Sequence, residues 1–321
     1  MVRYETGDGM ESYKVLIISQ NEKKKIMDKL DKNLYEKKAD IHGTCTKFFT
    51  DKKDFADMWS ENFKPMSDDI RPHCRIYSID TKGKLQVFYE PISKTVIIEN
   101  CDYYGWVKSI ALALVADFFE DFTSEHRRYS VHGSFIDSAG QGIAIIGPSG
   151  SGKTTLTYGL LLDERCNFVT DDWFFVRLTR NEVRVYSSEK NSYIHEDLAS
   201  SWPQFKNKLE NIRKDTKGRA IVDIKRIFSE ERIKENSVMK AIVLLRREKG
   251  KEVMKKLSKK EALEFMLKND FCNPHQLIKS KEKIKQRADF FSDLFSRVPV
   301  YLLNTVETPK ESLNRIKKVF E

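Results

Sequence analysis

Short runs of alternating or β-branched apolar residues, separated by turn residues, occupy much of the first hundred residues. Such runs are typical of strands that are buried on at least one face. We therefore predict strands over residues 13–19, 74–80, 84–90 and 94–100, the last two forming a meander. Residues 103–122 carry apolar side chains at helical spacing, which predicts a long helix. These elements indicate a smaller α+β N-terminal unit over residues 1–128, to which the pattern assigns no function.

From residue 129 onward the hydrophobic pattern switches between the strand period and the helix period. Strands are predicted over residues 129–136, 142–147, 167–172, 173–178, 182–187, 240–247 and 298–304. Helices are predicted over residues 153–164, 205–214, 259–270 and 281–297. Because strands and helices are mixed, we expect residues 129–321 to form an α/β domain.

The last helix has the clearest boundary signals in the sequence. Thr308 suits the N-cap position, Pro309 suits the first helical position, and Glu311 can complete a capping box. We therefore predict a C-terminal helix that begins at Pro309 and runs close to the end of the chain.

The composition bounds the class of protein. The chain has 321 residues, 40% of them hydrophobic and 33% charged, which is typical of a globular protein with roughly two domains. No signal peptide is recognisable at the start, and the longest apolar helical stretch, residues 109–119, is too short to span a membrane. The five scattered cysteines favour a reducing compartment. We expect a cytoplasmic protein with no membrane partner.

The net charge is +9, and much of the basic excess lies late in the chain. Residues 245–260 contain eight lysines and arginines against two glutamates, and residues 279–287 contain five basic residues against one acid. A basic patch of this kind is compatible with RNA, an anionic substrate or an acidic protein. The simpler interpretation is a solvated surface, and binding to nucleic acid stays an open alternative.

The stretch GPSGSGKTT matches the phosphate-binding pattern G-x-x-x-x-G-K-[ST] between a predicted strand and a predicted helix, which is the required context. Glycines let backbone N–H groups approach phosphate oxygens, and the helix N-terminus favours an anion. Lys153 is expected to reach the terminal phosphates, and the Thr154 hydroxyl can bind Mg²⁺. The predicted nucleotide-binding residues are Gly147, Pro148, Ser149, Gly150, Ser151, Gly152, Lys153, Thr154 and Thr155. The stretch thus predicts a site for ATP or another polyphosphate.

Two adjacent acids, Asp171 and Asp172, end the predicted strand that follows the phosphate-binding helix. In open α/β sheets such strand ends face the ligand. One acid can bind Mg²⁺, while the other accepts a proton from an attacking hydroxyl group. The alternative is a simple metal site beside an aspartate that only caps a turn.

Three blocks of the chain resemble the catalytic domain of HPr kinase/phosphorylases. Residues 131–155 resemble the segment in which a His-Gly strand leads into the phosphate-binding loop, and residues 167–172 resemble the acidic pair that follows. Residues 217–229 resemble the family's signature, an Arg-Gly-x-Gly stretch that runs into IIDV and LFG. The resemblance covers residues 129–245. The phosphate-binding loop is also similar to that of ATP-dependent phosphoenolpyruvate carboxykinase, which shares this core.

The resemblance implies a P-loop-containing catalytic core of the HPr kinase and phosphoenolpyruvate carboxykinase type, and therefore a kinase that uses ATP and Mg²⁺. By resemblance, Asp171 is the base, Thr154 and Asp172 bind the metal, Lys153 binds phosphate, and His132 orients the phosphates or the acids. The supporting residues carried over from the signature are Lys217, Gly218 and Asp223. HPr kinases assemble into rings, so the resemblance also admits a homo-oligomer.

The chain departs from the family in several places. Lys217 replaces the signature arginine, and Thr154-Thr155 stands where the HPr enzymes favour Ser-Glu. The later stretch that the family uses to dock HPr is not recognisable. HPr is therefore not expected to be the acceptor, and a protein serine, a small metabolite or a nucleic-acid hydroxyl takes its place.

Three hypotheses follow for the function. The first is a kinase that transfers the γ-phosphoryl group of ATP to a hydroxyl acceptor. The second is a nucleotide-sensing regulatory protein that binds ATP without transferring phosphate. The third, motivated by the net charge of +9, is a kinase that acts on RNA.

Overall fold

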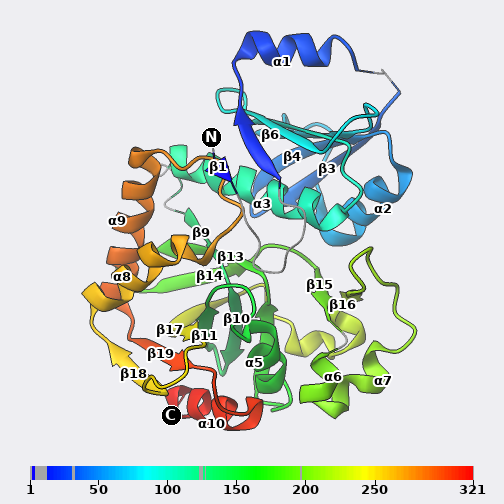
Figure 1. Ribbon diagram of the computed structural model, residues 1–321. Helices are drawn as coiled ribbons and strands as arrows, with labels where there is room; N and C mark the ends of the chain where they lie inside the picture. The colour runs from blue at the N-terminus through cyan, green and yellow to red at the C-terminus, as the bar shows by residue number, and fades with distance from the viewer. Residues whose placement is uncertain are drawn as a thin grey trace. The chain divides into compact units, whose positions relative to one another are not determined.

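The computed structural model describes residues 2–3, 13–30, 33–122, 126, 128–195 and 197–320. The backbone separates into two compact units, whose elements are labelled in Figure 1. The first comprises Met1–His126 and Pro274–Ser280, and the second comprises Arg127–Asn273 and Lys281–Glu321. The short excursion at Pro274–Ser280 has no signal in the hydrophobic pattern of the sequence.

The first unit contains an eight-stranded mixed sheet with the strand order β1-β2-β7-β8-β6-β4-β3-β5. Its strands are β1 (Val2–Arg3), β2 (Lys14–Ile17), β3 (Tyr35–Ile41), β4 (Thr44–Thr50), β5 (Lys64–Pro65), β6 (Cys74–Ile79), β7 (Gln86–Glu90) and β8 (Thr95–Glu99). Its helices within the described residues are α1 (Gln20–Met27), α2 (Lys53–Asn62) and α3 (Tyr104–Asp121). The four predicted strands and the long helix are confirmed as β2, β6, β7, β8 and α3, and β7 pairs antiparallel with β8.

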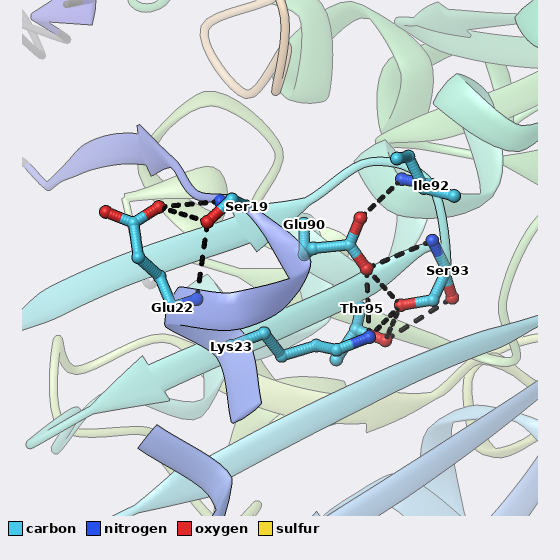
Figure 2. A network of polar contacts seen from close by, with 7 residues as sticks. All are labelled: Ser19, Glu22, Lys23, Glu90, Ile92, Ser93 and Thr95. Atoms are coloured by element: carbon cyan, nitrogen blue, oxygen red, sulfur yellow. Dashed lines mark hydrogen bonds and ion pairs between the residues drawn. The ribbon is translucent and has the colours of Figure 1, made fainter. Parts of the chain in front are cut away.

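Glu90 organises the turn between β7 and β8 (Figure 2). Its carboxylate accepts hydrogen bonds from the backbone N–H groups of Ile92 (2.8 Å) and Ser93 (3.1 Å). The Lys23 ammonium group donates a third bond of 2.9 Å from α1, and the Ser93 hydroxyl donates a fourth. Only 1% of the Glu90 side chain is exposed, so protein donors replace water around its charge. The turn therefore also anchors α1.

α3 is buried on nearly all sides because its residues are almost all apolar or small. Its Asp117 is nevertheless a buried acid, and it accepts hydrogen bonds from the Lys94 ammonium group and the Tyr89 hydroxyl. Lys94 also donates to Asp121, one turn further along the helix. These pairings allow charged groups to lie under the helix without an uncompensated desolvation cost.

The second unit contains a nine-stranded mixed sheet with the order β12-β10-β11-β17-β14-β13-β9, in which β19 pairs with both β17 and β18. Its strands are β9 (Arg128–His132), β10 (Ser134–Ser138), β11 (Gln141–Ile146), β12 (Cys166–Thr170), β13 (Trp173–Leu178), β14 (Val183–Ser187), β17 (Asn236–Arg246), β18 (Met254–Leu257) and β19 (Val300–Asn304). A separate antiparallel pair joins β15 (Asn191–Ile194) to β16 (Ala220–Asp223).

Helices cover both faces of this sheet (Figure 1). They are α5 (Lys153–Leu160), α6 (Leu198–Ser201), α7 (Lys206–Leu209) and α10 (Pro309–Phe320) on one face, and α8 (Lys259–Lys268) and α9 (Lys281–Arg297) on the other. Val243 and Leu245 of the central strand belong to the first hydrophobic cluster, whereas Ile242 and Leu244 belong to the second. Strand alternation thus divides the core into two layers, and the predicted α/β class is confirmed.

The predicted strand over residues 129–136 is wrong in one respect, because the structure breaks it at Gly133 into β9 and β10. β9 pairs with β13 and β10 pairs with β12, so the two pairs form one long antiparallel ladder with a bend in the middle. The Gly133 N–H donates to the Asp172 carbonyl (2.8 Å) at this bend. A Cβ atom at Gly133 would lie 2.8 Å from the Ile145 carbonyl oxygen, so only glycine fits without a shift of the backbone.

Two predicted helices are shorter in the structure. The helix predicted over residues 205–214 contracts to the single turn of α7, and Asn211 beyond it has a φ of 62°. The helix predicted over residues 153–164 ends at Leu160 in α5. Its last carbonyl groups are met by the Arg232 guanidinium group, whose Nη2 donates to Leu161 O (2.7 Å). A cation at this position also complements the helix dipole.

The predicted C-terminal helix is confirmed as α10, which begins at Pro309. The Thr308 N–H and hydroxyl both donate to the Glu311 carboxylate, and the Glu311 N–H donates to the Thr308 hydroxyl (3.3 Å), which is the predicted capping box. All five cysteines are described, and each is a buried free thiol. No helix among the described residues is long and apolar enough to cross a membrane.

We predict that Glu90→Gln destabilises the first unit at neutral pH by about 2 kcal/mol, because its donors lose a charged acceptor. Burial by itself raises the pKa of Glu90, but the bonds from Ser93, Lys23 and the backbone outweigh it and lower that pKa. The stabilisation is therefore present above the unfolded-state pKa and is lost as the pH falls through the lower folded-state pKa. Unfolding midpoints at pH 7 and pH 3 should show a difference from wild type that shrinks at acid pH.

Glu22→Gln is the matched control, because Glu22 accepts similar bonds from Ser19 in an exposed capping box (Figure 2). It should shift the midpoint much less than Glu90→Gln. Equal shifts for the two variants would show that the buried turn has no special weight.

Candidate functional site

The predicted phosphate-binding loop joins β11 to the N-terminus of α5. Gly150 and Gly152 have φ angles of 73° and 95°, in the left-handed region that favours glycine. Gly152 is the N-cap residue of α5 and supplies no side-chain cap, so the first N–H groups of the helix lack that partner. A helix N-terminus of this kind presents donors and a positive dipole end to an anion.

The base of the loop is packed against the end of β17. A Cβ atom at Gly147 would lie 2.6 Å from Ser151 Oγ and 2.9 Å from Leu245 Cβ, so a side chain cannot enter. Ser151 is buried, and its Oγ is without a hydrogen-bond partner within the described part of the chain. The Thr305 hydroxyl, just after β19, donates to the Ser151 carbonyl (2.9 Å). The loop is thus fixed at its base and has an unsatisfied polar atom inside it.

Lys153 is the first residue of α5, and its ammonium group folds back over the loop. Nζ donates to the Gly147 carbonyl (2.7 Å) and to the Pro148 carbonyl (3.1 Å). Burial lowers the pKa of Lys153, and the nearby Cys272 and Asp172 act on that pKa in the opposite direction. Lys153 therefore lies within electrostatic range of the second predicted acid.

Asp171 and Asp172 occupy the bend between β12 and β13. β10 runs antiparallel to both β11 and β12, so these two strands end at the same edge of the sheet. The phosphate-binding loop and the acid pair consequently follow strand ends at one edge. The structure brings together the two motifs that the sequence predicts to share a site.

The two acids have different surroundings. Asp171 is 8% exposed, and its Oδ2 accepts a hydrogen bond from the Tyr158 hydroxyl (3.0 Å). The Asp172 side chain is 36% exposed, and its Oδ1 lies 3.3 Å from His132 Nε2. One acid therefore faces the core beside α5, while the other faces the end of β9.

His132 bridges Asp172 and the residue Cys272. Its Nδ1 lies 2.7 Å from the Cys272 carbonyl oxygen, which can only accept, so Nδ1 carries a proton. Nε2 then donates to Asp172 only when the ring is doubly protonated and positively charged. The ring also packs edge-on against Trp173, with centroids 5.7 Å apart. His132 is thus placed to orient Asp172.

The Cys272 carbonyl group, which accepts the hydrogen bond from His132, belongs to an unusual turn. Asp270, Phe271 and Cys272 have φ angles of 49°, 56° and 54°, three consecutive non-glycine residues in the left-handed region. This conformation costs roughly 1–2 kcal/mol per residue. Burial raises the pKa of the Cys272 thiol to about 12, and Lys153 opposes that rise. Asp270 and the following Asn273-Pro274 are typical turn residues, but nothing in the sequence predicts left-handed φ angles at Phe271 and Cys272, so sequence analysis missed the part of this turn in the site.

The signature residues have local roles in the β15–β16 region. The Lys217 N–H donates to the Asp215 carboxylate (2.9 Å), and Gly218 supplies a φ of 74° in the same turn. Asp223 is exposed and caps a short 3-10 helix by accepting from the Lys225 N–H (3.0 Å). This stretch reaches the acid pair through Phe228, whose ring stacks on Tyr158 at 6.5 Å. Lys217, Gly218 and Asp223 therefore take part in the turns on either side of β16.

We predict that Gly147→Ala lowers the free energy of unfolding by about 1–3 kcal/mol, because the new Cβ overlaps Ser151 and Leu245. Gly140→Ala is the control, since its Cβ would meet nothing within 4 Å and only the φ of 82° opposes it, at about 1 kcal/mol. Urea unfolding should rank Gly147→Ala as the more damaging variant. The reverse order would contradict the tight base of the loop.

No protein-family model matches the chain. An HPr kinase/phosphorylase of Chlorobium limicola (strain DSM 245 / NBRC 103803 / 6330) is 27% identical over 135 residues, which are 42% of this chain and 35% of the relative. An HPr kinase/phosphorylase of Polaromonas sp. (strain JS666 / ATCC BAA-500) is 33% identical over 140 residues, 42% of this chain and 38% of the relative.

A solved structure of the HPr(Ser) kinase/phosphatase from Coxiella burnetii covers 59% of this chain and 94% of its own, with 14% sequence identity. Its TM-score of 0.35 is too low to establish a shared fold. The chain matches little more than a third of the length of the two curated relatives. Over about two fifths of its own length, this chain is similar in sequence to curated HPr kinase/phosphorylases.

Proposed function

We propose that this protein is an ATP- and Mg²⁺-dependent kinase of the HPr kinase-like type that transfers the γ-phosphoryl group to a hydroxyl acceptor. The observation that carries the proposal is the position of Lys153 and the Asp171–Asp172 pair at one edge of the sheet. The curated relatives, which are named HPr kinase/phosphorylases, support the same class of reaction.

The loop fits the phosphates of a nucleotide. The start of α5 has no side-chain cap, and the Ser151 hydroxyl lies buried in the loop without a partner in the described residues, so a phosphate group would satisfy both. A Cβ atom at Gly150 would meet nothing within 4 Å, so the tip of the loop is open. Lys153 would exchange its bonds to the loop carbonyls for bonds to the β- and γ-phosphates.

The donor set also fits Mg²⁺. The described residues contain no group of three or more His, Cys, Asp or Glu side chains placed to bind a metal by themselves. Mg²⁺ commonly takes one or two protein oxygens and completes its shell with phosphate oxygens and water. Thr154 and Asp172 would supply those protein oxygens, and bound Mg²⁺ neutralises charge on the phosphates.

The acceptor hydroxyl would be activated by Asp171. The oxygen of the acceptor hydroxyl would form a bond to the γ-phosphorus while the bond from that phosphorus to the bridging oxygen of ADP breaks. The hydroxyl proton would pass to Asp171. His132 orients Asp172 beside this centre. The aromatic residues Trp173 and Phe174 line the strand beyond the acids and are fully buried, which keeps water from that side.

The acceptor is proposed to be a protein serine or a small molecule other than HPr, in the cytoplasm. This rests on the divergence of the chain, which matches its curated relatives over only part of their length. RNA as acceptor and assembly into a homo-oligomer are further proposals that the basic surface and the family resemblance motivate.

We predict that Asp171→Asn reduces phosphoryl transfer by at least ~10²-fold, while Mg²⁺–ATP binding stays nearly unchanged, because only the base is lost. The assay follows labelled γ-phosphate from ATP into a heat-treated lysate, whose products are separated into protein, RNA and small-molecule fractions. Asp293→Asn is the matched control, since Asp293 pairs with Arg297 on the exposed side of α9.

The outcomes separate the three hypotheses. Label that enters one fraction and disappears only in Asp171→Asn supports the kinase and identifies the class of acceptor, including RNA. No label in any fraction, with tight Mg²⁺–ATP binding, would replace the kinase with the nucleotide sensor.

We predict that Lys153→Met weakens Mg²⁺–ATP binding by at least about 10-fold, because a charged hydrogen bond to phosphate is lost. Burial lowers the pKa of Lys153, so its ammonium group loses its proton at a lower alkaline pH than an ordinary lysine does. In the wild type, Mg²⁺–ATP binding should therefore also weaken as the pH rises through that lowered pKa. Titration calorimetry checks both results. Lys225→Met, which removes an exposed ion pair with Glu230, should leave the affinity unchanged.

A further inference from the structure

A chain of hydrogen bonds runs from β15 through α5 to Asp171. The Tyr158 hydroxyl donates to Asp171 Oδ2 at 3.0 Å, and a second hydrogen bond joins Tyr158 to the Ser192 side chain. Both Tyr158 and Ser192 are buried. The Tyr158 hydroxyl thus lies between the Ser192 side chain and Asp171.

The Tyr158 ring is fixed in this position by its neighbours. Phe205 packs edge-on at 5.6 Å and Phe228 stacks at 6.5 Å. The next residue, Gly159, has no room for a Cβ atom because the Trp202 ring would lie 2.5 Å away. Trp202 Nε1 in turn donates to the Thr155 carbonyl of the same helix (2.7 Å). The hydroxyl group therefore cannot swing away from Asp171 without disturbing the core.

The protonation of Tyr158 suits a donor. Burial, and then the charge of Asp171, raise the pKa of Tyr158 well above its usual value, so the phenol keeps its proton throughout the physiological range. The phenol can therefore donate to Asp171 and hold that carboxylate in place.

We propose that Tyr158, supported by Ser192, is a positioning residue that holds Asp171 in the orientation that its role as the base requires. The inference rests on the proposed function, since it concerns the same acid. Tyr158 does not touch the reacting atoms in this proposal and acts only through Asp171. Its position on α5 would otherwise be read as an ordinary core site.

The alternative is that Tyr158 only fills the core. A phenylalanine would fill the same space, so loss of the hydroxyl alone separates the two interpretations. The groups that also act on Asp171 and Asp172 are Lys153 at the start of α5 and His132 of β9. Neither is changed by substitution at Tyr158, so a fall in kcat at an unchanged KM reports the lost hydrogen bond.

The experiment measures kcat and the KM for ATP in Mg²⁺–ATP turnover by wild type, Tyr158→Phe, Ser192→Ala and Asp171→Asn, with water as acceptor and with the labelled lysate. Tyr158→Phe should lower kcat by about 10-fold, because Asp171 loses the hydrogen bond that fixes its orientation. The KM for ATP should stay within about twofold. Ser192→Ala should lower kcat in the same direction and by less.

Tyr193→Phe is the matched control, because it removes a phenol from the opposite face of the strand that carries Ser192. It should leave kcat and KM unchanged. An unchanged kcat in Tyr158→Phe, with Asp171→Asn inactive, would overturn this inference and leave the proposed function intact. Full turnover in Asp171→Asn, or no turnover in wild type, would overturn both.

Discussion

The close approach of the phosphate-binding loop to the ends of two parallel strands is the constraint on which the rest of the site depends. β11, β17 and β19 run parallel, so their C-terminal ends meet at one edge of the sheet. Thr305, just beyond β19, has its hydroxyl 2.9 Å from the Ser151 carbonyl and 3.1 Å from the Arg246 carbonyl. With Gly147 in contact with Leu245, the loop has one place to lie, and α5 starts from it.

A second constraint brings the acids to the same edge. The strands β9–β10 and β12–β13 form one antiparallel ladder that bends at Gly133 and, opposite it, at the two acids. Asp171 and Asp172 lie at this bend, and their side chains contact different partners, Tyr158 and His132. Bends of this kind are a common way to aim side chains at a site. The bend therefore connects the topology of the sheet to the chemistry.

Local signals explain which parts could be predicted from the sequence. The phosphate-binding loop, the acid pair and the capping box at Thr308 each need particular residue types at fixed spacing, so the sequence shows them directly. The bend at Gly133, the left-handed turn at Cys272 and the bond from Tyr158 to Asp171 depend on residues far apart in the chain. The hydrophobic periodicity of the sequence predicts that Tyr158 is buried, but it cannot predict which group the Tyr158 hydroxyl contacts. α1 was missed for the opposite reason, since none of its residues is buried.

The two acids have different surroundings, which makes them chemically inequivalent. Two equivalent carboxylates side by side would repel one another and share a single role. Here a neutral phenol from the core meets Asp171, whereas an imidazole and, at longer range, an ammonium group meet Asp172. The more exposed Asp172, within range of the Lys153 ammonium group, suits the proposed metal ligand, and the buried Asp171 with its neutral donor suits the proposed base. The bend between β12 and β13 thus gives two adjacent acids the different surroundings that the proposed division of roles requires.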